Sequence, residues 1–275
     1  MTAGVGQDPA LEAGRVVLDE KRIATAAGLP NGVIRVEAVV DSTNSRLARC
    51  RDAGEPVRIL LAEHQSAGRG RHGRRWLSPP GRGLYLSMAW SFQQPPRELG
   101  ALSLTAGLAA AEAVERQVAV RVGLKWPNDL QIDGRKLGGC LVDLATGRNG
   151  STNAILGIGI NVDFRGLDGP DQPWTDLAAH AGCIDRNRLA VDLIQGLDQE
   201  LDRFNQAGFD ASAARWRGRD VLFGRDLVLI TSGQANLDGR GAGIDAHGGL
   251  MVETDQGRRI VRSGEVSLRI RTHDT

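Results

Sequence analysis

The segment between residues 121 and 162 is the part of the sequence that most constrains the fold. Short runs of apolar and β-branched residues follow one another there, separated by turn residues, which is typical of consecutive strands. Asp133 and Gly134 form a two-residue turn of the kind that closes a β-hairpin. We therefore expect a sheet that includes strands at residues 121–126, 129–132, 136–144 and 154–162.

The preceding part of the chain predicts more strands and most of the helices. Alternating or apolar runs predict strands at residues 33–40, 57–62 and 84–92. Several helix-capping residues at positions 41–44 introduce a helical run that ends near residue 53. Further helices are expected at residues 9–26, 98–118 and 188–204. The many alanines of the 98–118 helix suit close packing against a sheet.

The pattern changes after Trp216. Short β-branched runs at residues 227–230, 250–253 and 259–261 are separated by Gly and Asp, which favours a small all-β barrel. We therefore divide the chain into a lead segment at residues 1–32, a main domain at 33–216 and a C-terminal barrel domain at 217–275.

Composition excludes several classes of protein. The net charge of +1 is unlike that of a domain whose main task is to grip nucleic acid. Cys50, Cys140 and Cys183 are widely spaced, so we interpret them as reduced thiols and expect no metal site built from a side-chain cluster. The sequence lacks a secretory signal and an apolar stretch long enough to cross a bilayer core of ~30 Å, so we expect a cytoplasmic protein without a membrane span.

The segment from Gly68 to Trp76 combines glycines with four arginines. Glycine lets backbone N–H groups approach an anion, and the arginine fork matches phosphate and carboxylate. Fixing a residue costs about 1–2 kcal/mol, so we expect a loop that is disordered without ligand and ordered by it. A solvated basic loop or an RNA-binding patch is the alternative, although an aromatic content of 4% offers few platforms for base stacking.

A second informative segment runs from residue 124 to residue 140. Lys136 stands before Gly138 and Gly139, where a ligand can meet an ammonium group with little steric hindrance. Taken alone, Lys136 is more typical of a solvated strand lysine than of a ligand-binding one. Asn128 and Asp129 follow a proline, and alone they could be ordinary turn residues.

Taken together, these segments resemble the biotin protein ligase family. The matching motifs are Asp41-Ser42-Thr43-Asn44, Glu63 to Arg71, Lys125-Trp126-Pro127-Asn128-Asp129, Lys136-Leu137-Gly138-Gly139 and Gly157 to Val162. They stand in the family order and cover about residues 38–165. The resemblance implies an α/β (α+β) fold, with a mixed-sheet catalytic domain related to class II synthetases and lipoate ligases and a small C-terminal SH3-like β-barrel.

The resemblance also implies the roles of individual residues. It places at the biotin pocket Ser42, Thr43, Asn44, Gln65, Gly68, Arg69, Gly70, Arg71, Lys136, Gly138 and Gly139. It places at ATP and the adenylate Arg71, Arg74, Trp76, Asn128, Lys136 and Asn161. The implied catalytic residues are Lys136, Arg69, Arg71 and Asp129, of which Asp129 would serve the second step. Ser42 and Asn44 could also simply cap a helix.

The implied reaction uses biotin and ATP as substrates, with Mg2+ bound to the triphosphate. Biotinyl-5'-AMP would form first, and a lysine of the biotin carboxyl carrier domain of acetyl-CoA, acyl-CoA or pyruvate carboxylase would then take the biotin. Family members that also repress transcription carry an N-terminal DNA-binding domain. Since only about 32 residues precede the first expected strand, we expect a monofunctional ligase without specific DNA binding.

Other functions stay open on the sequence alone. The alternatives are a lipoate-type acyl ligase and a non-catalytic module that binds biotin or RNA. We expect a monomer or a weak homodimer, since the sequence contains no decisive self-complementary stripe.

Overall fold

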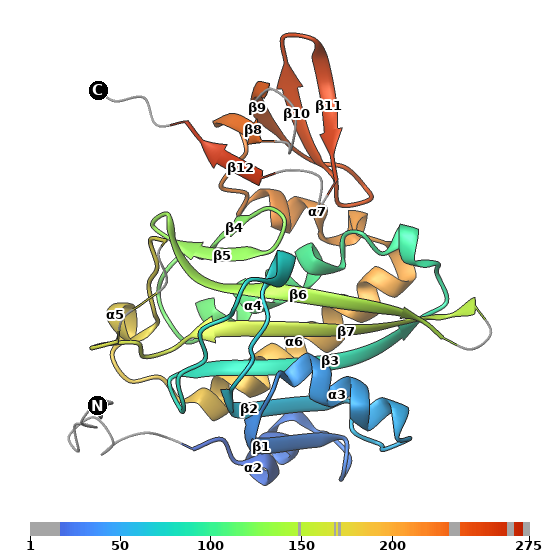
Figure 1. Ribbon diagram of the computed structural model, residues 1–275, viewed down its shortest axis with the longest axis vertical. Helices are drawn as coiled ribbons and strands as arrows, with labels where there is room; N and C mark the ends of the chain where they lie inside the picture. The colour runs from blue at the N-terminus through green and yellow to red at the C-terminus, as the bar shows by residue number, and fades with distance from the viewer. Residues whose placement is uncertain are drawn as a thin grey trace, which may run out of the picture.

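The computed structural model describes residues 17–147, 150–167, 169, 172–230, 237–262 and 267–271. A seven-stranded sheet forms its centre, with helices on both faces and a second, smaller sheet beyond one edge (Figure 1). The strand order in the central sheet is β1-β2-β3-β7-β6-β5-β4. The bounds are β1 (Ile34–Val40), β2 (Ile59–Gln65), β3 (Gly83–Phe92), β4 (Gly123–Lys125), β5 (Asp129–Ile132), β6 (Arg135–Thr146) and β7 (Thr152–Asn161).

The sheet is mixed because its first two strands are connected differently from the others. β1 and β2 are parallel and are joined through the helix α3 (Thr43–Asp52), since parallel neighbours need a crossover connection. All other neighbours in this sheet are antiparallel. Asp133 and Gly134, both with positive φ, form the turn between β5 and β6, which confirms the predicted hairpin.

Two long helices cover one face of the sheet, and α3 lies on the other (Figure 1). α4 (Leu102–Glu115) is buried almost all round, because it lies between the sheet and α6 (Arg186–Ala207). The shorter helices are α2 (Glu20–Ala27), α5 (Ala178–Ala181) and α7 (Asp210–Arg217), with 3-10 turns η1 (Arg71–Gly73) and η2 (Pro96–Glu98). None of the described helices is both long and apolar enough to span a membrane.

The C-terminal unit is a five-stranded antiparallel sheet in the order β11-β10-β9-β8-β12. Its strands are β8 (Asp226–Ile230), β9 (Leu237–Ile244), β10 (Leu250–Thr254), β11 (Gly257–Val261) and β12 (Ser267–Ile270). Trp126 connects this unit to the main sheet, since its indole Nε1 donates to the carbonyl of Gly248 at 2.9 Å. This contact between the two units therefore lies only three positions before β5.

The predicted fold class, a mixed α/β fold with a separate C-terminal β unit, is confirmed. The predicted 98–118 helix is shorter at both ends: η2 and a turn precede α4, and α4 ends at Glu115. Of the predicted 9–26 helix, residues 9–16 lie outside the described part, and the rest overlaps α2, which ends one residue later. β9 was not predicted because three of its eight residues are glycines. α7 and β12 were not predicted either.

The lead segment contributes to the main core where the structure describes it. Leu18 and Ile23 are buried in the same hydrophobic cluster as the central sheet and α6. Asp19 caps α2 by accepting from the backbone N–H of Arg22, and the backbone N–H of Asp19 donates to the side chain of Asn187 on α6 at 2.7 Å. Residues 17–27 therefore pack with the main domain.

Candidate active site

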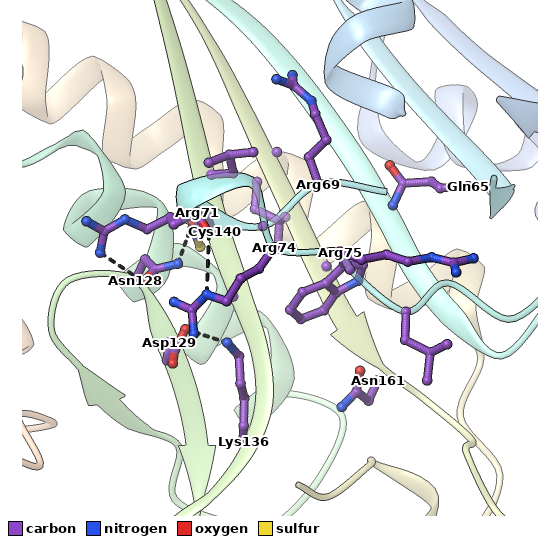
Figure 2. A pocket seen from close by; sticks show the side chains of 18 of the residues that line it. Gln65, Arg69, Arg71, Arg74, Arg75, Asn128, Asp129, Lys136, Cys140 and Asn161 are labelled. Carbon is purple, nitrogen blue, oxygen red and sulfur yellow. Dashed lines mark hydrogen bonds and ion pairs between the residues drawn. The ribbon is translucent and has the colours of Figure 1, made fainter. Parts of the chain in front are cut away.

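A cavity of about 650 Å3 opens on the face of the sheet that carries α3. Its walls come from the N-terminus of α3, the segment after β2 and strands β5 to β7 (Figure 2). Phe164, Gly169, Gln172 and Trp174, which follow β7 in the chain, also line it. Most of the predicted site residues line it: Ser42, Thr43, Asn44, Gln65, Arg69, Gly70, Arg71, Arg74, Trp76, Asn128, Asp129, Lys136, Gly139 and Asn161. One cavity thus collects predicted residues from Ser42 to Asn161, which are 119 positions apart in the chain.

Glycines on β7 make its floor, because side chains from elsewhere occupy the space above them. A Cβ on Gly157 would lie 2.2 Å from Oδ1 of Asn44. A Cβ on Gly159 would lie 2.7 Å from the indole ring of Trp76. These two glycines are two residues apart on one strand and so face the same side of the sheet. Asn44 and Trp76 can pack closely on the strand only because both positions are glycine.

The α3 end of the cavity is polar and hydrogen bonded. Gln65 accepts through Oε1 from the backbone N–H of Thr43 at 2.9 Å and from the Thr43 hydroxyl at 3.2 Å. Its Nε2 donates to Oγ of Ser78 at 3.0 Å. Ser42 holds the N-cap position of α3 without making a side-chain capping bond. Its hydroxyl is therefore not committed to the cap and is available to a ligand.

The opposite end of the cavity is cationic. Lys136 pairs with Asp129, Nζ to Oδ1 at 2.8 Å, and its ammonium lies 5.5 Å from the ring centroid of Trp76. Arg71 and Arg74 belong to the loop above this pair (Figure 2). Burial lowers the pKa of Arg71, the charge of Asp129 opposes that shift, and the charge of Arg74 adds to it. The site therefore holds more positive than negative charge and suits an anion.

A β-bulge directs Lys136 into this cavity. In the pairing of β5 with β6, Leu130 lies opposite Gly138 while Gln131 lies opposite Lys136, so Leu137 is an extra residue on β6. Strand alternation alone would place Lys136 and Gly139 on opposite faces, since three positions separate them. With the bulge both line the cavity, and a Cβ on Gly139 would lie 3.7 Å from Cε of Lys136.

The glycine and arginine segment forms a small hairpin over the cavity. The backbone N–H of Gly70 donates to the carbonyl of Arg74 at 2.7 Å, and that of Trp76 to the carbonyl of Gly68 at 2.8 Å. The side chain of Arg69 points away from Lys136 (Figure 2) and pairs with Asp143 at 2.7 Å. The ligand-dependent ordering of this loop remains a prediction.

Two predicted residues support the cavity without lining it. A Cβ on Gly68 would lie 2.8 Å from the carbonyl oxygen of Trp76, so Gly68 allows the loop hairpin to close. A Cβ on Gly138 would lie 2.6 Å from the carbonyl oxygen of Gly159, so Gly138 allows β6 to approach β7. Both act through close backbone packing.

Several lining residues were missed by the sequence analysis. Phe164 and Trp174 make a tilted ring contact, with centroids 5.8 Å apart and planes at 55°. They line the cavity with Asn161, whose Nδ2 donates to the carbonyl of Thr175 at 3.0 Å. The backbone of Lys136 pairs with residues 173 and 175, which holds Trp174 beside the cationic end. The one signal available in the sequence was a tryptophan within a loop rich in Gly, Pro and Asp.

The cavity shows neither an activated thiol nor a metal cage. Cys140 lines the wall, and burial raises the pKa of its thiol to about 12, so it stays protonated at neutral pH. Within the described residues, no three His, Cys, Asp or Glu side chains cluster as metal ligands. The side chains of the cavity therefore suit an anion at one end and a hydrogen-bonding group at the other.

Comparison with known proteins relates the chain to ligases. Residues 36–161 match the Biotin/lipoate A/B protein ligase family, and residues 227–269 match the Biotin protein ligase C terminal domain. The chain is 39% identical over 256 residues to the Bifunctional ligase/repressor BirA of Salmonella typhimurium, which covers 92% of this chain and 79% of the relative. It is 31% identical over 261 residues to the Biotin--[acetyl-CoA-carboxylase] ligase of Mycobacterium tuberculosis, covering 92% and 96% of the two chains.

A solved structure shares the fold. The biotin protein ligase from Aquifex aeolicus in complex with biotin and ATP superposes with a TM-score of 0.72 and 30% sequence identity. The match covers 86% of this chain and 99% of that one.

Proposed function

Because the chain belongs to the biotin protein ligase family, we propose that it adenylates biotin with ATP and transfers the biotin to a lysine of an acceptor protein. One observation carries the proposal. A single cavity joins a hydrogen-bonding end at Thr43 and Gln65 to a cationic end at Lys136 and Arg71. Biotin has the same polarity, with a ureido ring at one end and a carboxylate at the other.

The polar end suits the ureido ring. That ring presents two N–H donors and a carbonyl acceptor, and hydroxyl and amide groups can satisfy both kinds. Ser42 and Thr43 provide hydroxyls, and Gln65 provides an amide that its own partners hold in place. All three side chains are nearly buried, so a ligand that left them unpaired would bind weakly.

The cationic end suits adenylation. In that step a biotin carboxylate oxygen bonds to the α-phosphorus of ATP, the bond from phosphorus to the β-phosphate oxygen breaks, and pyrophosphate leaves. Two anionic groups must approach each other, and positive groups held in place offset their repulsion and stabilise charge in the transition state. Lys136, Arg71 and Arg74 supply that charge, and Asn161 with Trp76 and Trp174 would enclose the nucleoside.

Transfer follows at the same end. The acceptor's ε-amine attacks the acyl carbon of biotinyl-5'-AMP, AMP leaves, and the amine loses a proton. Asp129 is free to orient or deprotonate that amine once Lys136 binds the ligand's charge instead of the carboxylate. A closed loop over residues 68–76 would also protect the mixed anhydride from water.

Magnesium is part of the substrate in this proposal. Asp129 is the one carboxylate among the described residues that line the cavity, and it pairs with Lys136. One occupied carboxylate is a poor magnesium cage, whereas magnesium commonly binds through nucleotide phosphates and waters. ATP would therefore bring the ion, and the residues present serve the phosphates.

The finer assignments are also proposals. We propose a biotin carboxyl carrier domain of a carboxylase as the acceptor, since the relative in Mycobacterium tuberculosis is named for that activity. We propose a catalytic domain at residues 33–216 and a barrel domain at 217–275, a cytoplasmic location, a monomer or weak homodimer, and no specific DNA binding.

The test is pyrophosphate release with ATP and magnesium, with biotin or lipoate as the acid. A unit charge about 4 Å from an anion is worth about 4 kcal/mol at an effective dielectric of 20. After a discount for water access, we expect Lys136→Ala to lower kcat/KM by about 100-fold to 1000-fold. Lys125→Ala is the matched control, because Lys125 is a partly buried strand lysine that does not line the cavity. Release with lipoate instead of biotin, or equal losses in both variants, would contradict the proposal.

A further inference from the structure

Asp143 on β6 joins two parts of the site that are far apart in sequence. Its Oδ2 accepts from Nδ2 of Asn44 on α3 at 3.0 Å and from Nη2 of Arg69 in the loop at 2.7 Å. Asn44 and Arg69 line both the main cavity and a neighbouring cavity of about 370 Å3, whereas Asp143 lines the neighbouring cavity alone. Asp143 thus acts on the main cavity through Asn44 and Arg69.

The carboxylate fixes which way the amide of Asn44 points. Asn44 is buried, and its Oδ1 accepts from the Ser87 hydroxyl at 2.6 Å. A hydroxyl can donate or accept, so Ser87 alone would allow either orientation of the amide. A carboxylate can only accept, so Asp143 selects the orientation with Nδ2 towards itself, and the carbonyl of Leu141 at 3.4 Å adds a weaker preference.

This orientation determines what Asn44 can offer to a ligand. Both hydrogens of Nδ2 have acceptors, in Asp143 and Leu141, and Ser87 occupies one lone pair of Oδ1. The remaining capacity is the second lone pair of Oδ1, which suits an N–H donor. A flipped amide would present an N–H group instead and would oppose a ureido N–H.

The same carboxylate holds the loop. The guanidinium of Arg69 is about half exposed, and its pair with Asp143 ties the hairpin of residues 68–76 to β6. An exposed pair is weak on its own. Here, however, one oxygen serves both contacts, so the loop position and the amide orientation depend on the same atom.

We propose that Asp143 is a positioning residue for biotin: it sets Asn44 as an acceptor for a ureido N–H and holds the loop over the bound ligand. The inference rests on the proposed function. It concerns biotin affinity more than the chemical step, because Asp143 does not line the main cavity and lies seven residues along β6 from Lys136 at the cationic end.

The experiment measures biotin binding by calorimetry and pyrophosphate release as a function of biotin and of ATP. We expect Asp143→Ala to weaken biotin binding about tenfold while the KM for ATP changes less than twofold. Asp143→Asn keeps an acceptor for Asn44 but loses the charge that Arg69 needs, so its loss should be about threefold. In the double variant Asp143→Ala with Arg69→Ala, the fold-loss of biotin affinity should be smaller than the product of the fold-losses of the two single variants.

The matched control is Asp198→Asn. Asp198 forms a similarly exposed pair with Arg58 at 2.6 Å, and neither residue lines either cavity. It should leave biotin binding unchanged. Suppose that the native protein releases pyrophosphate with biotin. If Asp143→Ala then keeps the native affinity for biotin, or if Asp198→Asn loses as much affinity as Asp143→Ala, the inference is overturned and the proposed function stands. Absence of biotin-dependent release in the native protein would overturn both.

Discussion

The glycines on β7 predict that one methyl group can impair either end of the cavity separately. Gly157 and Gly159 are on the same strand and the same face, and Gly157→Ala and Gly159→Ala are chemically identical changes. They differ in what the new Cβ meets, which is Oδ1 of Asn44 in one case and the ring of Trp76 in the other. We expect Gly157→Ala to raise the KM for biotin and Gly159→Ala to raise the KM for ATP.

The cost at Gly157 follows from how firmly Asn44 is held. The new Cβ would lie 2.2 Å from Oδ1, and ordinary contact begins at 3.4 Å, so Asn44 must retreat by roughly 1 Å. That movement breaks or weakens its bonds to Ser87 and Asp143, which are worth about 1 kcal/mol each. At 1.4 kcal/mol per tenfold change, biotin affinity should fall about 10-fold to 100-fold. The free energy of unfolding should fall by about 1–3 kcal/mol.

The cost at Gly159 is smaller for stability, because Trp76 is half buried and belongs to a loop. The ring can move off the strand, which removes its contact with the Lys136 ammonium. We expect the KM for ATP to rise about tenfold and the free energy of unfolding to fall by less than about 1 kcal/mol.

Steady-state pyrophosphate release and urea unfolding of both variants provide the assay, and each variant is the control for the other. If the two variants raise the same KM, or if Gly159→Ala affects biotin and Gly157→Ala affects ATP, the assignment of the two ends is refuted. Unchanged kinetics in both would show that the floor of the cavity is not the ligand surface.

Two predictions concern the junction with the C-terminal unit. Burial raises the pKa of Asp220 to about 6, so the folded protein binds the proton more tightly than the unfolded chain. Stability is therefore lost as pH rises from about 4 through about 6. Asp220→Asn should raise the free energy of unfolding by about 1–2 kcal/mol at pH 8 but not at pH 4. Urea titrations at both pH values check the sign, and equal effects at the two pH values would contradict the prediction. Trp126→Phe should lower the free energy of unfolding by about 1 kcal/mol, because the Gly248 carbonyl loses its indole donor. Urea unfolding and steady-state kinetics check this: lower stability with little change in the KM for biotin indicates a structural role, and a raised KM indicates a direct role in binding.

Much of the site could be predicted from sequence because its residues occur in compact motifs. Thr43 and Gln65 stand at the start of a helix and the end of a strand that share one crossover, so the topology alone brings them together. The motif around Lys136 lies on a hairpin whose turn, Asp133-Gly134, can be predicted from the sequence. Trp174 and Asp143 belong to no such motif. They reach the site through long-range contacts, which a single sequence does not display.

The position of Lys136 shows most clearly where sequence reasoning ends. Alternation along β6 predicts that Lys136 and Asp143, seven positions apart, face opposite sides of the sheet. The extra residue at Leu137 reverses the phase of the strand, so Lys136 shares a face with Gly139 and, through regular alternation, with Asp143. Leu137 itself is buried in the core, which gives the bulge an apolar anchor. The bulge therefore places Lys136, at the cationic end of the site, on the same face as Asp143, whose carboxylate contacts the polar end. The sequence pattern of a strand cannot reveal the bulge without the pairing register.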